Sequence, residues 1–492
     1  MEIPMFSRSL SQITTDKSTM GNGLNAERTS RRVSRLARAV VLVLATPMIA
    51  SATTPASMES SKFFPGDVTS SFGSSVAVYG DTAVVGDPLN SVDGSMSGAA
   101  WVFVRSGTTW VEETRLIPTG ASANDRFGTS VDIYDNYIVV GSPNDIGAGG
   151  TTGGSAYVFR REGATWIEEI KLIGSATVVG DPWDGPGSGD NFGHSVAING
   201  DVPADATSSD IWYNIIVGAP EDTHSQTIDA GSVHAYQLNA DGSAWIPMGK
   251  IYSNSPAGND RFGQSVDLDG DHMIVGAYLD GDDLAGGITN PGAAYVWVRR
   301  GILGMWNLET RLTAGDPEAH DHFGESVAVN AYGGLATFVV GAPGDDDLGA
   351  SSGSAYIFRG SAMTFPQLPK LLASDGSTSG GFGSSVAVNN DLMLIGATGA
   401  GALGEGSVYV ISRDGYSWVE SQRLTASSST TLDDLGISAA LTGDVALAGS
   451  PAAVGSTSYG GAVYVFDDLI DDHLFSDDFE SGNTGAWSAA TP

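Results

Sequence analysis

Alternating hydrophobic and polar residues around a tight polar turn define the organising pattern of this chain, and the pattern is clearest over Asp260–Gly276. The run Ser265–Leu268 alternates with a period of two, Asp269–Asp271 supplies a polar turn, and Met273–Val275 forms a second apolar run. Because alternation at period two places side chains on opposite faces of a strand, two such runs around a short Gly-containing turn predict a β-hairpin.

This hairpin recurs along the chain, and each copy opens with Phe-Gly or a variant of it. The copies start at Phe72, Phe127, Phe192, Phe262, Phe323 and Phe382, with a decayed one at Leu435. Each continues with Gly-(Ala/Ser/Asp)-Pro or a variant, then with a Gly-small-Ala-aromatic segment. Several end with a Trp…(Arg/Lys)-Leu segment such as Trp110–Leu116. Each unit is therefore predicted to contain four short strands.

Seven such units in tandem predict an all-β fold, a seven-bladed β-propeller of four-stranded antiparallel blades. One sheet cannot bury both of its faces, whereas packing blade on blade buries them. The Phe-Gly and Gly-Ala-Pro landmarks, spread over residues 58–467, resemble FG-GAP repeats, the units of the integrin alpha-chain amino-terminal propeller and of many exported bacterial proteins. The resemblance implies the propeller fold and a ligand site on its loop face or at its central channel.

The last unit lacks a final strand of its own, since it ends at Val463–Phe466. The segment Met58–Phe64, ahead of the first Phe-Gly, is a fair copy of the missing strand, with Lys62 as its basic residue. We therefore expect the amino-terminal strand to complete the last blade and close the ring. The alternative is a linear array, whose two exposed sheet edges would invite aggregation.

Two segments lie outside the repeats. Residues 1–52 contain a basic flank, the apolar run Ala39–Ala45 and a small-residue exit at Ala50–Ala52, which together predict a secretory signal peptide; a signal anchor is the alternative. The acidic tail, residues 468–492, contains Phe479–Ser488, which resembles a short terminal tail of various exported bacterial proteins. This tail is either a sorting or attachment element or a disordered end.

Charge and composition narrow the class of protein. The chain has 23 Lys and Arg against 57 Asp and Glu, for a net charge of −34, which argues against nucleic acid as a partner. It has no cysteine, so an exported form would fold without disulfides. No apolar run after the first segment approaches the roughly 18–20 residues needed to cross a bilayer. We expect a monomer that is secreted, periplasmic or at the cell surface.

Carboxylates cluster in the loops that follow Gly-Ala-Pro, and these loops are the candidate calcium sites. The candidate ligands are Asp280, Asp282 and Asp283 in the fourth unit and Asp345, Asp346 and Asp347 in the fifth. Neighbouring acids repel one another unless a cation or solvent screens them, and a bound calcium ion would remove the repulsion. Solvated acidic loops are the alternative.

The resemblance to integrins implies a calcium-binding motif, but the sequence of this chain departs from that motif. In that family the turn of the first hairpin carries Asp-x-Asp-x-Asp-Gly-x-x-Asp. Asp267, Asp269 and Asp271 come nearest to it, but Val275 stands at the closing position. We interpret these turns as ordinary hairpins in which Gly, Asn and Asp supply positive φ.

The sequence gives little support for a catalytic function. The histidines show no zinc-protease spacing, and His320–His322 occupies a repeat position where other units have Asn-Asp-Arg. The serine of Phe-Gly-x-Ser recurs in every intact unit and is interpreted as architectural, and the repeated tryptophans as core residues. We therefore predict no catalytic residue and no cofactor besides calcium.

The sequence favours an exported, non-enzymatic binding or adhesion module, with loops presented on a rigid scaffold to a protein or carbohydrate ligand at the cell surface. The third unit carries the longest insertions, Ile173–Asp190 and Asp201–Asp210, which are either binding loops or neutral insertions. One alternative is a structural component of the cell envelope or matrix, held by the tail. Another is an enzyme that uses the propeller channel, which a cluster of perturbed titratable groups there would favour.

Overall fold

The alternating segments form the predicted β-hairpins in the computed structural model. The structure describes residues 56–64, 71–146, 153–174, 189–201, 212–223, 227–281, 288–300, 305–332, 334–361, 364–415, 417–427, 432–453 and 460–469. The predicted signal peptide, the tail from residue 470 onward, Asp282 and Asp283, and most of both insertions of the third unit lie outside these residues.

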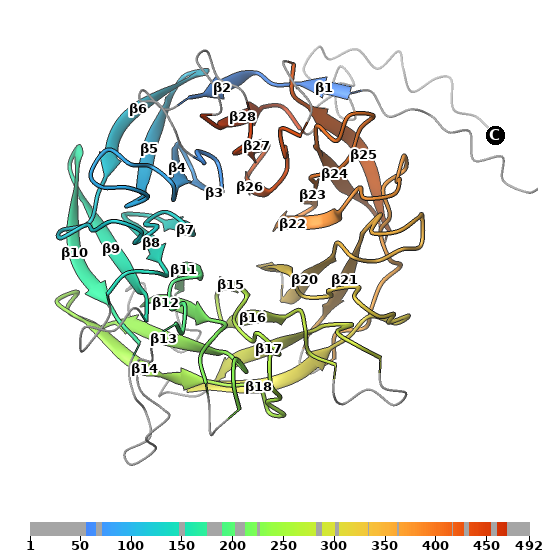
Figure 1. The fold of residues 1–492 in the computed structure, drawn as a ribbon, viewed down its shortest axis with the longest axis horizontal. Helices are drawn as coiled ribbons and strands as arrows, with labels where there is room; N and C mark the ends of the chain where they lie inside the picture. Colours follow the sequence, from blue (N-terminus) through green and yellow to red (C-terminus); the bar gives the residue numbers. More distant parts are fainter. Residues whose placement is uncertain are drawn as a thin grey trace, which may run out of the picture. The chain divides into compact units, whose positions relative to one another are not determined.

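The strands fall into concentric sets around a central channel (Figure 1). The innermost strands are β3 (Ser75–Tyr79), β7 (Val131–Tyr134), β11 (Ser195–Asp201), β15 (Ser265–Asp269), β19 (Ser326–Tyr332), β22 (Phe382–Asn389) and β26 (Ser438–Thr442). The second strands are β4 (Thr82–Asp87), β8 (Tyr137–Ser142), β12 (Trp212–Ala219), β16 (His272–Ala277), β20 (Leu335–Ala342), β23 (Leu392–Ala397) and β27 (Val445–Ser450).

The outer half of each blade follows the same order. The third strands are β5 (Ala99–Ser106), β9 (Ser155–Glu162), β13 (Ser232–Leu238), β17 (Ala293–Arg300), β21 (Ser354–Gly360), β24 (Ser407–Asp414) and β28 (Ala462–Phe466). The outermost strands are β6 (Thr109–Leu116), β10 (Thr165–Leu172), β14 (Trp245–Ile251), β18 (Met305–Leu312) and β25 (Ser417–Thr425), together with β1 (Ala56–Met58) and β2 (Ser61–Phe63). We number the blades 1 to 7 by their innermost strands in chain order.

The ring closes through the amino-terminal strand, as predicted. β2 pairs antiparallel with β28 and brings Lys62 opposite Tyr464 and Phe63 opposite Val463. Each innermost strand contacts the next one around the channel, and β26 returns to β3. The fold is therefore the expected all-β seven-bladed propeller, and the linear-array alternative is wrong.

Two blades depart from the predicted four antiparallel strands. Blade 5 has only three strands, because Pro366 and Pro369 fall in the segment that would form the fourth and cannot donate backbone hydrogen bonds. Isolated bridges replace that strand, among them Ala355 with Leu371. Blade 6 instead gains a fifth strand, since β1 pairs in parallel with the outer edge of β25.

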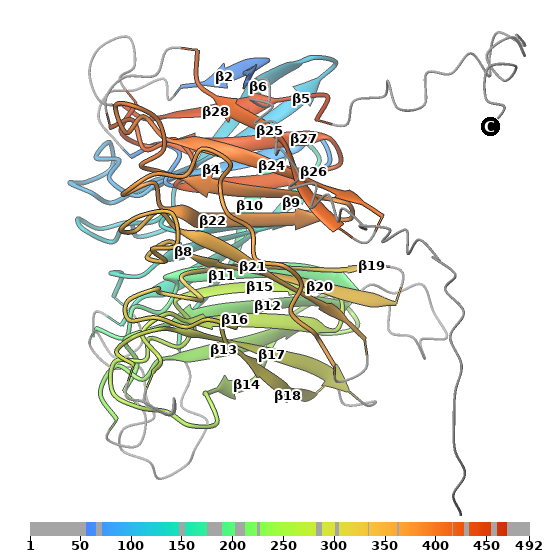
Figure 2. The same cartoon turned by 90° about the vertical axis from the view of Figure 1, so that its right-hand side faces the viewer.

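The two ends of the ring differ in their connections, and Figure 2 shows the blades edge-on between these ends. One end, the turn face, carries the tight turns within each hairpin; in blade 1, the backbone N–H of Arg105 donates to the carbonyl of Asp81 there. The other end, the loop face, carries the loops between second and third strands and the connections between blades. In the same part of the ring, the Phe127 N–H donates to the Ser97 carbonyl at the loop face.

A repeated hydrogen bond joins each innermost strand to the next blade. The serine of Phe-Gly-x-Ser donates its hydroxyl to the carbonyl oxygen of the next Phe-Gly glycine. The pairs, at 2.8–3.0 Å, are Ser75–Gly128, Ser130–Gly193, Ser195–Gly263, Ser265–Gly324, Ser326–Gly383, Ser385–Gly436 and Ser438–Gly73. The architectural interpretation of this serine is confirmed.

The glycine of Gly-Ala-Pro makes this contact between blades possible. A Cβ atom at Gly341 would lie 2.1 Å from the carbonyl oxygen of Gly383 and 2.3 Å from the Ser326 Oγ. Any side chain there would separate the two blades. Glycine is therefore required by close backbone approach.

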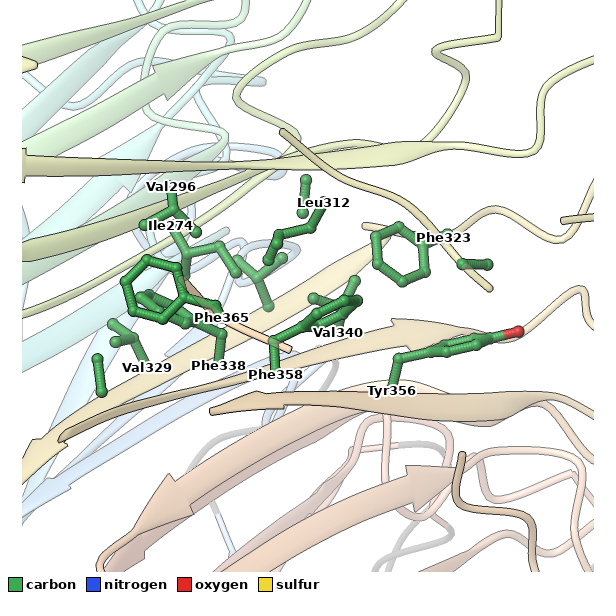
Figure 3. Packing of buried hydrophobic residues seen from close by; sticks show 14 of the residues in the cluster. Ile274, Val296, Leu312, Phe323, Val329, Phe338, Val340, Tyr356, Phe358 and Phe365 are labelled. Carbon is green, nitrogen blue, oxygen red and sulfur yellow. The ribbon is translucent and has the colours of Figure 1, made fainter. Parts of the chain in front are cut away.

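The hydrophobic core is divided among the interfaces between blades. The cluster between blades 4 and 5 combines Ile274 and Val296 of blade 4 with Phe338 and Tyr356 of blade 5 (Figure 3). Similar clusters occupy the other blade interfaces. Each blade thus depends on both neighbours for burial of its faces.

Candidate functional site

The predicted calcium ligand of blade 5, Asp345, lies in a buried ion-pair network at the loop face. Its carboxylate accepts hydrogen bonds from the hydroxyl groups of Ser354 and Tyr356, each at 2.9 Å. The Nζ of Lys370, on the outer edge of the blade, lies 3.0 Å from the same carboxylate and 2.6 Å from that of Asp347. The charge of Asp345 is therefore balanced by a lysine of its own blade.

Lys370 is held as a cation by its acidic neighbours. Burial by itself lowers the pKa of this lysine, but hydrogen bonds to Asp316, Asp347 and Asp345 reverse the effect and raise the pKa above its ordinary value. Asp346, next to this network, is exposed.

Asp280 of blade 4 has the same surroundings. Its carboxylate accepts two hydrogen bonds from the Arg311 guanidinium, at 2.6 and 3.2 Å, and one from the Tyr295 hydroxyl. This bidentate geometry suits arginine and is among the stronger hydrogen-bonded pairs. Asp280 and Asp345 thus occupy equivalent positions, each between a tyrosine of the third strand and a basic residue further out.

Blades 2 and 3 carry the same arrangement. Asp145 of blade 2 accepts from the Tyr157 hydroxyl and lies 2.9 Å from the Lys171 Nζ. In blade 3, Asp222 lies 2.7 Å from the Lys250 Nζ, and His234 replaces the tyrosine. We call these sets the loop-face triads. In blades 2 to 5, the basic residue of the outer segment is therefore the internal partner of the loop acid, a role that the sequence did not indicate.

These contacts bear on the calcium prediction but do not test it. The described residues contain no group of three or more His, Cys, Asp or Glu side chains that could hold a metal ion. The repulsion for which calcium was invoked is relieved at Asp280 and Asp345 by Arg311 and Lys370. Asp282 and Asp283 lie outside the described residues, so calcium at these loops stays a prediction.

Acids that precede Phe-Gly cap the connections between blades. Asp321 is buried, and its carboxylate accepts a 2.7 Å hydrogen bond from the Glu318 N–H. Burial raises its pKa to about 6. His320 and His322, on either side, have φ of 67° and 59°, as Asn259 has at the equivalent place with 68°. His320–His322 is therefore a variant of a repeat position, as predicted.

The central channel is a cavity with a volume of about 390 Å³. All seven innermost strands contribute to its wall, which is mainly aliphatic. Its charged lining residues are Asp132, Asp267 and Asp269. Asp132 was not among the residues predicted from the sequence. Alignment of the repeats would have shown it, because five other blades have alanine there, at Ala77, Ala197, Ala328, Ala387 and Ala440.

Asp132 and Asp267 tie neighbouring innermost strands together. The Asp132 carboxylate accepts from the N–H of Ile133 at 2.8 Å and from that of Ile198, in the next blade, at 2.6 Å. Asp267 accepts in the same way from Leu268 and Val329, at 2.8 and 2.7 Å. Burial in the channel wall raises the pKa of Asp132 to about 8 and that of Asp267 to about 7.

The loop face carries exposed aliphatic side chains in most of its loops. They include Val92, Ile146, Ile228, Leu348, Leu403 and Leu432. Because the blades are related by rotation about the channel, these side chains lie at the same end of the ring. Scattered apolar residues are common on surfaces, but repetition at one end is the feature expected of a binding face. The repeated tryptophans do not contribute, since Trp110, Trp166, Trp245 and Trp418 are buried, as predicted, and Trp306 is half-buried.

Comparisons with known proteins agree with this architecture. The sequence model of the FG-GAP repeat matches residues 58–103, 110–159, 245–297, 306–358, 365–411 and 418–466. No curated protein matches the chain. Among solved structures, the crystal structure of Saccharomyces cerevisiae Sqt1 is similar, with 12% identity and a TM-score of 0.42, over 84% of this chain and 99% of that one. A likeness at this level carries no argument about function.

Proposed function

Because this chain belongs to the FG-GAP repeat family and folds as a closed seven-bladed propeller, we propose that it is an exported, non-enzymatic binding module whose loop face contacts a protein at the cell surface. The observation that carries this proposal is the set of exposed aliphatic side chains at the loop face. Burying them against a partner would release about 25 cal/mol per Å² of apolar surface. Export itself rests on the sequence of residues 1–52.

The loop-face triads support the proposal by fixing the bases of the loops in blades 2 to 5. Leu348 lies three residues after Asp345 in the same loop, and its N–H donates to the Ser352 hydroxyl at 3.2 Å. Ser352 in turn donates to the carbonyl of Asp345 at 3.3 Å. A loop anchored by a buried ion pair loses less conformational entropy when a partner binds, which favours affinity.

The enzyme alternative rests on the raised pKa of Asp132 and Asp267. Each of their carboxylates accepts one hydrogen bond from its own strand and one from the next blade, so both already have a structural partner. A general acid or base needs a free oxygen aimed at its substrate. We therefore propose no catalytic role for them.

In the part of the chain that the structure describes, no helix has both the length and the apolar character to span a membrane.

The proposal is tested by surface binding with loop-face variants. The variant Leu348→Ser/Leu403→Ser/Leu432→Ser removes three exposed aliphatic side chains, and Val111→Ser/Ile167→Ser is the matched control on exposed positions of the outermost strands β6 and β10. We expect purified full-length protein to bind intact cells of the producing organism, with a loss of about tenfold or more in the loop-face variant alone.

Two results would contradict the proposal. Equal binding by both variants would remove the loop face as the site of contact. Loss of binding only on deletion of residues 471–492 would favour the alternative of an envelope component held by its tail.

A further inference from the structure

The turn-face end of the channel, which we call the channel mouth, is lined by one side chain from each of six blades. They are Tyr79, Tyr134, Asn199, Asp269, Asn330 and Asn389. These residues occupy the same repeat position, four residues after the serine of Phe-Gly-x-Ser. The repeat therefore presents different side chains at one level of the ring.

Aromatic side chains occupy one arc of the channel mouth. The rings of Tyr79 and Tyr134 lie 4.8 Å apart with an interplanar angle of 47°. Tyr213, from the second strand of blade 3, continues the arc 6.2 Å beyond Tyr134. The Tyr213 hydroxyl is held by the Asp135 carboxylate at 2.6 Å, and 40% of Tyr79 is exposed. Tyr213 is thus held in place behind the arc, and Tyr79 is open to solvent.

Amide groups occupy the opposite arc and orient one another. The Nδ2 atoms of Asn199 and Asn330 donate to the two carboxylate oxygens of Asp269, at 3.2 and 3.1 Å. The Oδ1 of Asn330 accepts from the Asn390 N–H at 3.0 Å. The Nδ2 of Asn390 donates to the Oδ1 of Asn389 at 2.9 Å. This chain of hydrogen bonds crosses blades 3 to 6 and fixes the planes of the amides before any ligand binds.

We propose that the channel mouth binds a neutral oligosaccharide, with one sugar ring against the tyrosine arc and its hydroxyl groups on the amide arc. The electron-rich face of a tyrosine attracts the C–H groups of a sugar ring, which carry partial positive charge. An asparagine side chain both donates and accepts, as a sugar hydroxyl does. Apolar rings facing a few oriented polar groups are the usual composition of a small-molecule site.

Size and charge favour the same class of ligand. The channel volume of about 390 Å³ falls within the range of roughly 300–1,000 Å³ for small-molecule sites. Its described lining contains no Lys, Arg or His, and its acidic side chains would disfavour an anionic sugar. Asp269 accepts hydrogen bonds from both asparagines and from the Ala331 N–H, at 2.7 Å, which compensates its charge without a bound cation.

This site is independent of the loop-face proposal, since it lies at the other end of the ring. The test is isothermal titration of the full-length protein with a panel of neutral trisaccharides (maltotriose, cellotriose, laminaritriose, mannotriose and chitotriose). The variants are Tyr134→Ala and Tyr134→Phe at the mouth, and Tyr332→Ala as a control, because Tyr332 is 67% exposed in blade 5 and does not line the channel.

We expect at least one trisaccharide to bind with a millimolar or lower Kd. Tyr134→Ala should weaken that binding by about tenfold or more, Tyr134→Phe by less, and Tyr332→Ala not at all. The loop-face triple variant should bind the sugar as the native chain does. If Tyr134→Ala fails to fold, Asn330→Ala, which removes an amide of the opposite arc, gives the same comparison.

Three results would overturn the inference. The first is the absence of binding across the panel at millimolar sugar. The second is binding that Tyr134→Phe and Tyr134→Ala leave unchanged. The third is binding of spermidine, titrated in parallel as a cationic control, in place of any sugar, which would make the channel an acidic site for amines.

Discussion

The hydroxyl of Ser438 donates a 2.8 Å hydrogen bond to the carbonyl oxygen of Gly73, 365 residues earlier in the chain. The same bond joins each of the other blades to its successor, so this one closes the circle between blades 7 and 1. Closure also brings Phe72 into a parallel bridge with Gly461. The two ends of the repeat region are therefore joined by the contacts that join all other neighbours.

Because β2 closes the ring, we predict that Phe63→Ala strongly destabilises the fold. Phe63 is buried, stacks on Phe103 with ring centroids 4.3 Å apart and meets the edge of Trp110 at 5.8 Å. Its truncation should lower the free energy of unfolding by about 3–5 kcal/mol. Phe64→Ala, at the adjacent exposed residue, should change it by about 0.5 kcal/mol or less. Urea unfolding measures both, and equal effects would show that β2 does not close blade 7.

Close approach of the blades predicts that Gly341→Ala destabilises the fold. Its Cβ would enter the contact between Ser326 and Gly383, at a cost of about 3 kcal/mol. Gly258→Ala is the control, because the nearest atom to its Cβ would be the Ile228 carbonyl oxygen at 3.6 Å, an ordinary contact. Circular dichroism melts of the two variants should differ clearly. Similar midpoints would mean that the blades can separate without loss.

The ion pair of blade 5 predicts a non-additive double-mutant cycle. Lys370→Met leaves the buried Asp345 without its cation and should cost about 3–5 kcal/mol. Adding Asp345→Asn should recover much of this loss, because a neutral amide needs no counter-ion. The control Arg160→Met, at exposed pairs with Glu162 and Glu169, should have a much smaller effect. Additive losses in the cycle would contradict the coupling.

The raised pKa values of Asp132 and Asp267 predict that the free energy of unfolding falls as the pH rises. Burial raises their pKa from the ordinary 3.8 to about 8 and about 7, so the native state holds these protons more tightly than the unfolded state. The contribution of these two groups to the free energy of unfolding is therefore lost as the pH rises from about 4 to about 8. The double variant Asp132→Ala/Asp267→Ala introduces the residue found in the other five blades. It should make the thermal midpoint nearly independent of pH over this window. An unchanged slope would place the pH dependence elsewhere.

The calcium proposal predicts a rise in the thermal midpoint with excess calcium over chelator, since an ion that binds only the folded chain stabilises it. The exposed carboxylate of Asp346 would be the main ligand in blade 5, because Lys370 already pairs with Asp345 and Asp347. Asp346→Asn should then abolish the rise, whereas Asp81→Asn, at an exposed hairpin turn, should not. A thermal midpoint that does not change with calcium would show that Lys370 and Arg311 are sufficient to balance the charge of the loop acids.

The fold could be predicted almost completely from the sequence, because its signals are local and repeated. Alternation at period two, short turns and recurring Phe-Gly identify hairpins, and a copy of the missing strand before Phe72 identifies the closure. The prediction was wrong at blade 5, where Pro366 and Pro369 already indicated the loss of a strand, and at blade 6, where β1 pairs in parallel.

The partners of the acids were decided by the tertiary structure. Asp280 and Asp345 are conspicuous in the sequence as acidic loops, but Arg311 and Lys370 reach them from 31 and 25 residues away, across the breadth of a blade. The channel mouth likewise exists only after closure, since Tyr79 and Tyr134 belong to different blades and meet because the ring brings equivalent positions to one level. Sequence alone determined which residues repeat. Only the circular packing of the blades decided which of them face one another, because that packing depends on contacts between units and not on any pattern within one.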